Sequence, residues 1–438
     1  MKSPQFTEVV LEKIVGGGQA LGALSDGRKA FVWGALPGEK VVIRVTKKKS
    51  RFVEGVVTEV LSASQERIAP LDPDSYLSTS PWQIMTLEAE QHYKAALIEE
   101  AFELHHIVLP DSIDVYTDER ITNYRNKVEF SFYGIEDAES YSDYLRLAFF
   151  RRGSKGKIPV ESCSLLPPSM MKLALDICAY LESVQVKARQ LKTLLIRCDQ
   201  NGNCVWQLYI KEETCEFMSD QEAASFDAQG GEVIYSDPRS PASRITKRLL
   251  SVGDVTLTDT VLGIPFRYAT EGFFQVNIPV YEQALRDMRK WVDASPKSPT
   301  LDLYSGVGSI GLTIGGDNCT LIEIDENAVR EMKRNIEEQG SHANAVLSAS
   351  EKATEHITSE HTVIVDPPRA GLHQAVIDRL LEVKPPRIIY LSCNPVTQAR
   401  DVSLLASAYG IRTHRGYNFF PRTPHTEHLV VLDTKQPR

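Results

Sequence analysis

The 438-residue sequence lacks the features of a secreted, membrane-spanning or disulfide-stabilised protein. No run reaches the roughly 18 consecutive apolar residues that cross a bilayer, and the first ten residues, MKSPQFTEVV, lack the apolar core of a signal peptide. The seven cysteines are an odd number without CxxC spacing, which argues against a disulfide framework and against a zinc site. These absences predict a cytoplasmic protein with reduced thiols and no membrane partner.

An overall positive charge is also missing. Lysine and arginine number 49 against 58 acidic residues, and the net charge is −9. By itself this balance argues against nucleic-acid binding, although a local basic patch on an acidic protein can still form a binding footprint. The length is too great for a single core, so we expect two or three domains.

The first 62 residues predict a small closed β-barrel of OB type. Short β-branched runs are separated by glycine turns at Gly16–Gly18, Gly27, Gly34 and Gly38. One hairpin is locally basic, with cations at Lys40, Arg44, Lys47, Lys48, Lys49 and Arg51. These side chains form either a solvated face or, as we favour, a contact with RNA phosphates.

Residues 63–262 predict a mixed α/β region. Proline-rich residues 62–86 are expected to form a loop, and apolar residues at helical spacing predict a helix from Leu87 to His106. Further expected elements are strands at 124–133, 144–152, 193–199 and 203–211 and a helix at 168–186. Tyr124-Arg125-Asn126-Lys127 is either a substrate contact or a polar strand start, with equal support for each.

From residue 263 to 438, strands alternate with helices, which predicts a parallel sheet. A strand at 300–304 leads into a GxGxxG loop that begins at Gly306. Glu323 ends the next strand, 323 − 306 = 17 residues further on, where a carboxylate can bind both ribose hydroxyls. The pattern therefore predicts a nucleoside-containing cofactor, either NAD or S-adenosylmethionine.

Two more strand ends carry reactive groups. The strand at 362–365 ends in Asp366-Pro367-Pro368-Arg369, and the strand that starts at Arg387 ends in Cys393. A thiol at this edge of an open sheet faces the ligand crevice, although a single free cysteine is more often a buried packing residue. Hydride transfer gives such a thiol no role, so the pattern favours methyl transfer over NAD chemistry.

Cys393 indicates which methyl transfer to expect. A thiolate that adds to C6 of uracil makes C5 nucleophilic, and a general base must later remove the C5 proton. Glu427, at the start of the last apolar strand, is the candidate base, with an exposed strand-edge carboxylate as the alternative. His425 and His428 flank it, and we interpret them as structural or RNA-facing residues and not as metal ligands.

The motifs together resemble the RNA uracil-C5 methyltransferase family over nearly the whole chain. They are GFFQVN (272–277), LDLYSGVGSIGL (301–312), IEID (322–325), DPPRAGL (366–372), SCNP (392–395) and FPRTPHTEHLVVL (420–432). The N-terminal barrel resembles the family's TRAM domain, an RNA-binding module. The resemblance implies three regions, with a TRAM-like barrel at 1–62, a central RNA-binding α/β domain at 63–262 and a Rossmann-like S-adenosylmethionine-dependent methyltransferase domain at 263–438. It also implies that the helix near 87–118 packs with the catalytic domain.

By the same resemblance Cys393 is the nucleophile and Glu427 the base. Gln275, Tyr304, Glu323 and Asp366 match the family's S-adenosylmethionine contacts. The barrel favours 23S ribosomal RNA over transfer RNA as the substrate, because bacterial transfer-RNA enzymes of this family commonly lack it. We also expect a monomer.

The chain departs from the family pattern at two places. Many relatives hold a 4Fe-4S cluster, but Leu77 and Ser80 occupy the spacing of two of its cysteines, and residues 62–90 contain none. Cys163 alone cannot hold a cluster, so we expect no iron–sulfur centre and no other metal. Ser305 replaces the family's cysteine in the glycine loop.

Three alternatives remain open at this level. In the first, the protein methylates another group without covalent catalysis. In the second, it methylates transfer RNA. In the third, it binds RNA through the barrel and its methyltransferase half is vestigial.

Overall fold

The computed structural model describes residues 5–136, 143–295 and 297–435. The chain forms two compact units. Unit 1 consists of Met1–Glu90, Arg120–Leu257 and Pro421–Pro424, and unit 2 of Gln91–Glu119, Thr258–Phe420 and His425–Arg438. The segment Gln91–Glu119 therefore belongs to the same unit as the C-terminal half.

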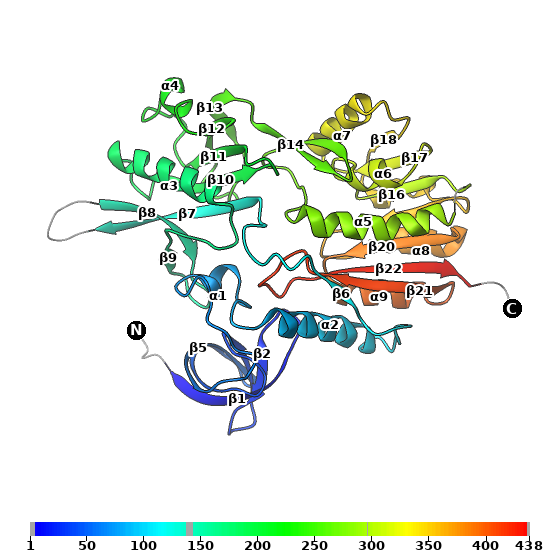
Figure 1. Cartoon of the computed structure of the whole chain (residues 1–438), viewed down its shortest axis with the longest axis horizontal. Coiled ribbons are helices and arrows are strands. Elements are labelled where there is room, and N and C mark those ends of the chain that lie inside the picture. The colour runs from blue at the N-terminus through cyan, green and yellow to red at the C-terminus, as the bar shows by residue number, and fades with distance from the viewer. Residues whose placement is uncertain (1–4, 137–142, 296, 436–438) are drawn as a thin grey trace. The chain divides into compact units, whose positions relative to one another are not determined.

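Unit 1 begins with a closed five-stranded barrel, as the sequence predicts (Figure 1). The order is β1-β2-β3-β5-β4, with β1 Phe6–Ile14, β2 Ala20–Ala23, β3 Lys29–Trp33, β4 Lys40–Lys48 and β5 Phe52–Ser62. Side chains alternate across each strand, so one face of each fills the barrel interior. Val9, Leu11, Val32 and Ile43 lie there and are almost fully buried.

The rest of unit 1 is a seven-stranded sheet in the order β13-β12-β11-β10-β7-β8-β9. Its strands are β7 Lys127–Glu136, β8 Asp143–Phe150, β9 Lys157–Pro159, β10 Leu191–Cys198, β11 Cys204–Ile210, β12 Gly230–Tyr235 and β13 Lys247–Gly253. Helix α3 (Pro168–Ser183) packs its apolar side on one face, where Phe130, Leu194 and Trp206 form the core. Two short helices, α1 (Tyr76–Thr79) and α4 (Asp220–Ala223), complete the unit.

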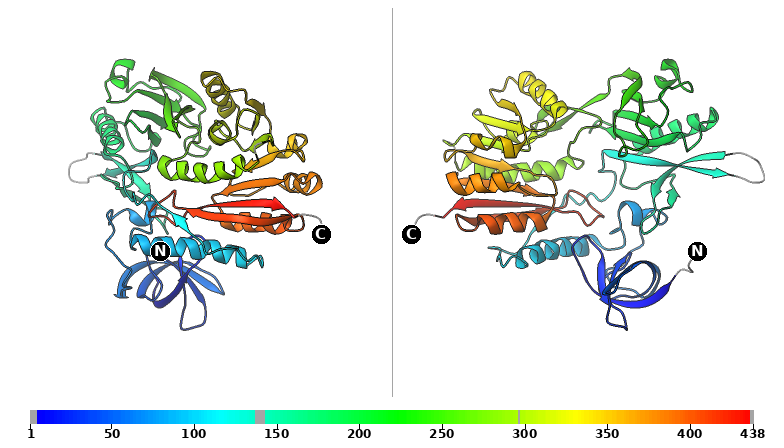
Figure 2. Two further views of the ribbon diagram at one scale, coloured as in Figure 1. Left: turned by 45° about the vertical axis from the view of Figure 1, so that its right-hand side comes forward. Right: turned by 180° about the vertical axis from the view of Figure 1, so that it is seen from behind.

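Unit 2 contains an eight-stranded sheet in the order β18-β17-β16-β19-β20-β22-β21-β6. The strands are β6 Val115–Tyr116, β16 Thr300–Leu303, β17 Cys319–Glu323, β18 Asn344–Leu347, β19 Thr362–Val365, β20 Arg387–Ser392, β21 Tyr409–Tyr417 and β22 Glu427–Thr434. The first five strands in this order are parallel, and β22, the red arrow in Figure 2, runs antiparallel to β20. Strands β17 and β18 lie on one side of β16, and β19 and β20 lie on the other. Such a reversal of strand order opens a ligand crevice at the carboxyl ends of the strands.

Helices cover both faces of this sheet. On one face α2 (Leu87–Glu103), α8 (Gln374–Val383) and α9 (Pro395–Leu405) pack against β16, β19 and β20. The other helices are α5 (Ile278–Asp293), α6 (Ser309–Ile314) and α7 (Glu326–Glu338), and a hairpin of β14 (Thr256–Val261) and β15 (Ile264–Ala269) packs on α7. The sequence predicts the strands at 300–304, 319–324, 362–365 and 387–391 almost to the residue, because continuous apolar runs mark fully buried parallel strands.

Some local expectations are wrong. The helix expected to reach His106 ends at Glu103, and His106 adopts a left-handed φ of 57°. The strand expected from Tyr124 begins at Lys127. Tyr124 and Asn126 are buried, with the Tyr124 hydroxyl donating to the Pro421 carbonyl at 2.9 Å, so neither is an exposed strand start or an RNA contact.

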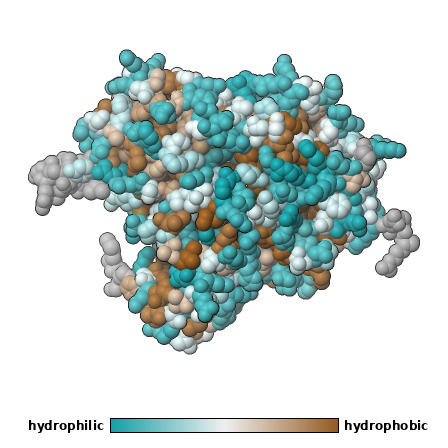
Figure 3. Space-filling model, in the orientation of Figure 1, coloured by the Kyte–Doolittle hydropathy of each residue, from teal (hydrophilic) through white to brown (hydrophobic). Residues whose placement is uncertain are grey.

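Among the described residues no helix is both long and apolar enough to cross a membrane. The face drawn in Figure 3 is mostly hydrophilic, with hydrophobic side chains in small patches.

Candidate active site

The glycine loop of unit 2 is built by strained backbone after β16. Tyr304, Gly306 and Gly308 all have positive φ, at 64°, 56° and 88°. At Gly308 a Cβ atom would lie 3.0 to 3.2 Å from Leu312 and Met332, so glycine is required there on two counts. A tyrosine in this region of φ is strained, and such strain is concentrated at ligand sites.

Ser305 anchors the loop to the neighbouring strand. Its hydroxyl donates to the Asp302 carbonyl at 2.6 Å and accepts from the Ile322 amide at 3.0 Å. Ser305 therefore joins β16 to β17 directly.

Glu323, at the end of β17, is held by backbone amides. One carboxylate oxygen accepts from the Gly306 amide at 2.9 Å, and the other accepts from the amides of Ile324 and Asp325, each at 2.8 Å. A carboxylate has about four acceptor positions, so these three bonds leave about one for a ribose hydroxyl, fewer than the two hydroxyls expected from the sequence. The bonds fix this carboxylate beside the glycine loop, which suits it to recognise a ribose.

Strand register brings Cys393 and Glu427 together. Ser392 of β20 pairs with His428 of antiparallel β22, so the next residues, Cys393 and Glu427, follow at the same end of the two strands. Asp366 and Arg369 follow β19, the parallel neighbour of β20. The sequence places Cys393 and Asp366 at one edge, whereas only the β20–β22 pairing brings Glu427 beside them.

The loop after β19 is fixed by the start of α9. The Arg369 carbonyl accepts from Asn394 Nδ2 at 2.8 Å and from Thr397 Oγ1 at 3.1 Å. Asn394 also caps α9 by accepting from the Val396 amide. The motif SCNP thus holds both its own cysteine and the DPPR loop.

All six sequence-predicted site residues line one cavity of about 870 Å³, within the usual size of a ligand site. They are Gln275, Tyr304, Glu323, Asp366, Cys393 and Glu427. Seven carboxylate side chains line it, namely Glu271, Glu323, Asp325, Glu331, Glu351, Asp366 and Glu427. Arg369 is the single lysine or arginine among the described lining residues, so the cavity suits a cationic ligand.

Burial and mutual repulsion hold protons on the reactive groups. Burial raises the pKa of Asp366 to about 7. Burial, with the nearby Asp366 carboxylate, raises the pKa of Glu427 well above its usual range. Burial, followed by repulsion from Glu427 and Asp366, raises the pKa of the Cys393 thiol to about 12, and the Arg369 guanidinium opposes both of the last two shifts. A cation added to this site would therefore favour the charged forms of all three groups.

Sequence reasoning missed several lining residues. Phe273 is 73% exposed and lines the cavity, whereas its neighbour Phe274 is buried and stacks on Tyr268 with ring centres 4.3 Å apart. Successive side chains of an extended segment point to opposite sides, so the sequence implies that one of these two rings points outward, and the structure shows that it is Phe273.

The loop that leads to Glu427 is supported by a buried lysine. Lys94 of α2 is fully buried, and its ammonium donates to Asn418 Oδ1 at 2.5 Å and to the carbonyl of Phe420, a lining residue, at 3.1 Å. No local pattern in the sequence connects residues 94 and 418.

The two histidines beside Glu427 differ. His425 is exposed, lines the cavity and lies 3.2 Å from Arg369 through its Nδ1 atom. His428 is fully buried, with Nδ1 2.8 Å from Gln398 Oε1 and Nε2 3.3 Å from His414 Nδ1, so it is structural and does not face RNA.

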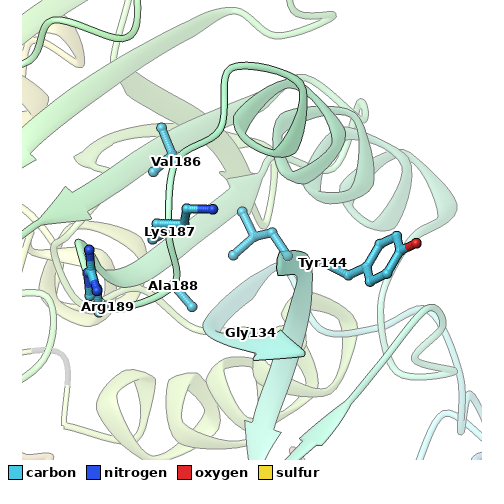
Figure 4. Close-up of a pocket in the computed structure, with 7 residues that line it drawn as sticks. Gly134, Tyr144, Val186, Lys187, Ala188 and Arg189 are labelled. Carbon is cyan, nitrogen blue, oxygen red and sulfur yellow. The ribbon is translucent and has the colours of Figure 1, made fainter. Parts of the chain in front are cut away.

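Unit 1 has cavities of other kinds. One of about 120 Å³ is lined by Gly134, Tyr144, Leu145, Val186, Lys187, Ala188 and Arg189 (Figure 4). None of these lining residues is a carboxylate, cysteine or histidine. Over the whole described chain, no group of three or more histidine, cysteine or acidic side chains is arranged to hold a metal ion.

Cys163 and Asp72 line a second cavity of unit 1, of about 660 Å³. Cys163 is buried, which raises the pKa of its thiol to about 11. Beside it, the buried carboxylate of Asp72 accepts from Gln83 Nε2 at 2.8 Å, the Ser164 amide at 3.0 Å and the Ser164 hydroxyl at 2.6 Å. Gln83 Nε2 also donates to Ser80 Oγ at 2.7 Å.

The strand order and the cavity at the strand ends define the fold of S-adenosylmethionine-dependent methyltransferases. A family model described as tRNA (Uracil-5-)-methyltransferase matches residues 92–435, and a TRAM domain model matches residues 7–58. The chain belongs to the tRNA (uracil-5-)-methyltransferase family, whose members are RNA (uracil-5-)-methyltransferases, and carries an N-terminal TRAM domain.

Relatives agree with this assignment over most of their length. An uncharacterized RNA methyltransferase of Nitratidesulfovibrio vulgaris is 27% identical, with 98% of this chain and 96% of the relative covered. Another, of Chlorobaculum tepidum, is 28% identical, with 95% and 93% covered. Among solved structures, a Pyrococcus abyssi tRNA (uracil-54, C5)-methyltransferase in complex with S-adenosyl-L-homocysteine has the same fold. Its TM-score is 0.76 and its identity 22%, over 97% of this chain and 100% of that chain.

Proposed function

We propose that this protein transfers a methyl group from S-adenosylmethionine to C5 of a uridine in RNA through a covalent bond from Cys393 to C6. The observation that carries the proposal is the β20–β22 register, which places Cys393 beside Glu427 in the cavity that Asp366 and the glycine loop also line. No other described cavity combines a thiol, a candidate base and a nucleoside-binding loop.

The residues of the cavity fit S-adenosylmethionine. Glu323 beside Gly306 is placed for the ribose, and Gln275, Tyr304 and Asp366 are the remaining proposed contacts. The excess of carboxylates suits the positive charge of a sulfonium. When bound, S-adenosylmethionine supplies an electrophilic methyl group, which the activated C5 of the uracil accepts.

Cys393 and Glu427 perform the covalent steps. The ionised sulfur of Cys393 bonds to C6, and the electron pair of the C5–C6 double bond moves toward C5 and O4. After C5 is methylated, Glu427 takes the C5 proton, the C5–C6 double bond forms again and the C6–S bond breaks, which returns the thiolate. A buried carboxylate with a raised pKa is a stronger base than an exposed one, so the environment of Glu427 suits this step.

The target uridine must leave its stack to be reached from both faces. Phe273, an exposed aromatic ring at the cavity, is placed to stack on the flipped base or on its neighbour. Arg369 is placed to stabilise the negative charge that develops on the ring and on the thiolate.

We propose 23S ribosomal RNA as the first substrate to test, on the family analogy of the barrel. The named tRNA methyltransferase of Pyrococcus abyssi shares the fold over 97% of this chain, which includes most of the barrel, so both RNAs belong in the assay. Mass-spectrometric mapping of 5-methyluridine in both RNAs, from cells with and without the gene, identifies the substrate.

Trapping tests the chemistry. RNA with 5-fluorouridine at the target cannot lose a C5 proton, so the wild-type protein should form a stable covalent complex, visible on a denaturing gel. Glu427→Gln should form such a complex with natural RNA, because the C5 proton is not removed. Cys393→Ala should form neither and lose methyl transfer. Full turnover by Cys393→Ala, or normal dissociation of Glu427→Gln, contradicts the proposed roles.

A further inference from the structure

Within unit 1, the turn between β8 and β9 packs directly on the barrel. Gly153 in this turn has a φ of 72°, and a Cβ atom there would lie 2.9 Å from the side chains of Thr46 and Val56. The guanidinium of Arg152 lies over the ring of Trp33 at 4.1 Å and donates to the Leu77 carbonyl. The turn and the barrel hairpin between β4 and β5 therefore lie side by side.

Buried polar contacts fix this arrangement. Glu39 of the barrel is fully buried and pairs with Arg67 at 2.5 Å, and Arg67 also donates to the Gly34 carbonyl at 2.8 Å. The indole of Trp82 donates to the Gly18 carbonyl at 3.0 Å. An ion pair with a fully buried carboxylate is costly to break, so these contacts keep the barrel in register with the rest of unit 1.

The two segments carry a concentrated positive charge. Residues 46–54 and 150–157, which we call the hairpin–turn surface, contain eight lysines and arginines and one acid, Glu54, in a chain of net charge −9. Its exposed cations are Lys47, Lys48, Lys49, Arg51, Arg151 and Lys155. Glu54 neutralises one of them through an ion pair with Lys47 at 2.6 Å. Elsewhere the barrel cation Lys40 is paired, with Glu8 at 2.7 Å, so it adds little net charge.

The hairpin–turn surface also carries an exposed aromatic ring. Phe150 is 66% exposed and directly precedes Arg151. Lys157 lies 5.4 Å from the centre of its ring and is held there by donating to the Phe132 carbonyl at 2.7 Å. Cations beside an exposed ring are the chemistry that binds unpaired RNA, with phosphates on the cations and a base stacked on the ring.

We propose that the hairpin–turn surface binds an unpaired segment of the RNA substrate, with the β8–β9 turn contributing as much as the barrel hairpin. Arg151 and Lys155 contact phosphates and Phe150 stacks on a base. The proposal rests on the proposed function for the assignment of an RNA substrate, and it adds a second RNA-binding segment that lies outside the TRAM match at residues 7–58.

The test is RNA binding as a function of salt. A labelled 20-nucleotide single-stranded RNA and a duplex of equal length are titrated with full-length protein over a range of KCl concentrations. Arg151→Gln/Lys155→Gln should weaken single-strand binding and reduce the slope of log K against log salt by roughly 1.4, about 0.7 for each lost phosphate contact. The matched control is Lys172→Gln/Arg286→Gln, which removes two exposed cations of helices α3 and α5 that each pair with an acid four residues away, and should leave the slope unchanged.

Phe150 is tested separately because stacking is insensitive to salt. Phe150→Ala should weaken single-strand binding by about tenfold with an unchanged salt slope, and Phe150→Tyr should restore it. In methylation assays these variants should raise KM for RNA and leave kcat unchanged.

The outcomes separate this proposal from the proposed function. If Arg151→Gln/Lys155→Gln binds single-stranded RNA with wild-type affinity and wild-type salt slope, the hairpin–turn surface is not an RNA-binding site, even if the enzyme methylates RNA. If the variant binds RNA more weakly but the wild-type protein makes no 5-methyluridine, the hairpin–turn surface does bind RNA and the proposed function is wrong. Tighter binding of the duplex than of the single strand overturns the stacking role of Phe150.

Discussion

At the scale of single residues, Arg369 sets the charge balance of the cavity. It is the one lysine or arginine in the described lining, and its guanidinium lowers the pKa of both Cys393 and Glu427 against the effect of burial. Arg369→Gln should raise the thiol pKa further, because the positive charge of the guanidinium favours the thiolate.

The measurement is the pH dependence of kcat/KM. The rising limb should move to higher pH in Arg369→Gln, and Arg369→Lys should move it part of the way back. His425→Ala, which removes the neighbour of Arg369 but no fixed charge, is the control. An unchanged rising limb in Arg369→Gln would show that the guanidinium does not act on the nucleophile.

Asp366 gives a second prediction at this scale, on stability. Because burial raises its pKa to about 7, the folded protein holds this proton where the unfolded chain, with a pKa of about 4, has lost it. The folded state thus binds more protons between these values, and stability falls as pH rises through that window. Asp366→Asn should remove this loss and stabilise the ligand-free protein at pH 8 by roughly 1–3 kcal/mol, with little effect at pH 4.

Urea unfolding at pH 4 and pH 8 provides the measurement. Asp378→Asn, at an exposed position of α8, is the control and should change neither value. Asp366→Asn should also lose methyl transfer if Asp366 contacts the cofactor. If the free energy of unfolding changed with pH equally in wild type and Asp366→Asn, the Asp366 carboxyl would be ionised in the free enzyme.

At the scale of elements, the sequence predicts strands better than it predicts their partners. The apolar runs that end in Asp366 and Cys393 indicate buried parallel strands, and the common edge follows from the α/β pattern. The pairing of β22 with β20 and the bonds from Lys94 to Asn418 and Phe420 join residues far apart in the chain. No local spacing encodes those contacts, so the position of Glu427 depended on the family resemblance. The adjacent rings of Phe273 and Phe274 are the exception, since their spacing implies that one of them points outward.

The segment around α1 supports another prediction at this scale. Asp72 joins the loop before α1 to Gln83 and Ser164 through three hydrogen bonds, beside the lone Cys163. Loss of a buried carboxylate leaves these donors unpaired, so Asp72→Ala should lower the free energy of unfolding by about 1–3 kcal/mol. Exposed Asp74→Ala, two residues away, is the matched control.

The same segment is where an iron–sulfur centre would be sought. We expect anaerobically purified protein to contain no stoichiometric iron, and we expect chelators to leave its unfolding unchanged, because the hydrogen bonds of Asp72 join the segments there. Bound iron in a stoichiometric amount, or destabilisation by a chelator, would contradict this.

At the scale of the whole molecule, two ligands should protect two different parts of the chain. Every described residue that lines the cavity belongs to unit 2, whereas the hairpin–turn surface belongs to unit 1. In hydrogen exchange, S-adenosylhomocysteine should slow exchange in peptides around the glycine loop at 304–312, Glu323 and Asp366, because ligand binding stabilises the backbone that it contacts. RNA with a 5-fluorouridine target should in addition slow exchange at 46–54 and 150–157. The variant Arg151→Gln/Lys155→Gln should lose the protection by RNA at 46–54 and 150–157 and keep the protection by S-adenosylhomocysteine.

Protection of residues 46–54 by S-adenosylhomocysteine alone would contradict the assignment of the two ligands to separate units. Protection by RNA that is confined to unit 2 would show that the barrel does not have the role proposed for it.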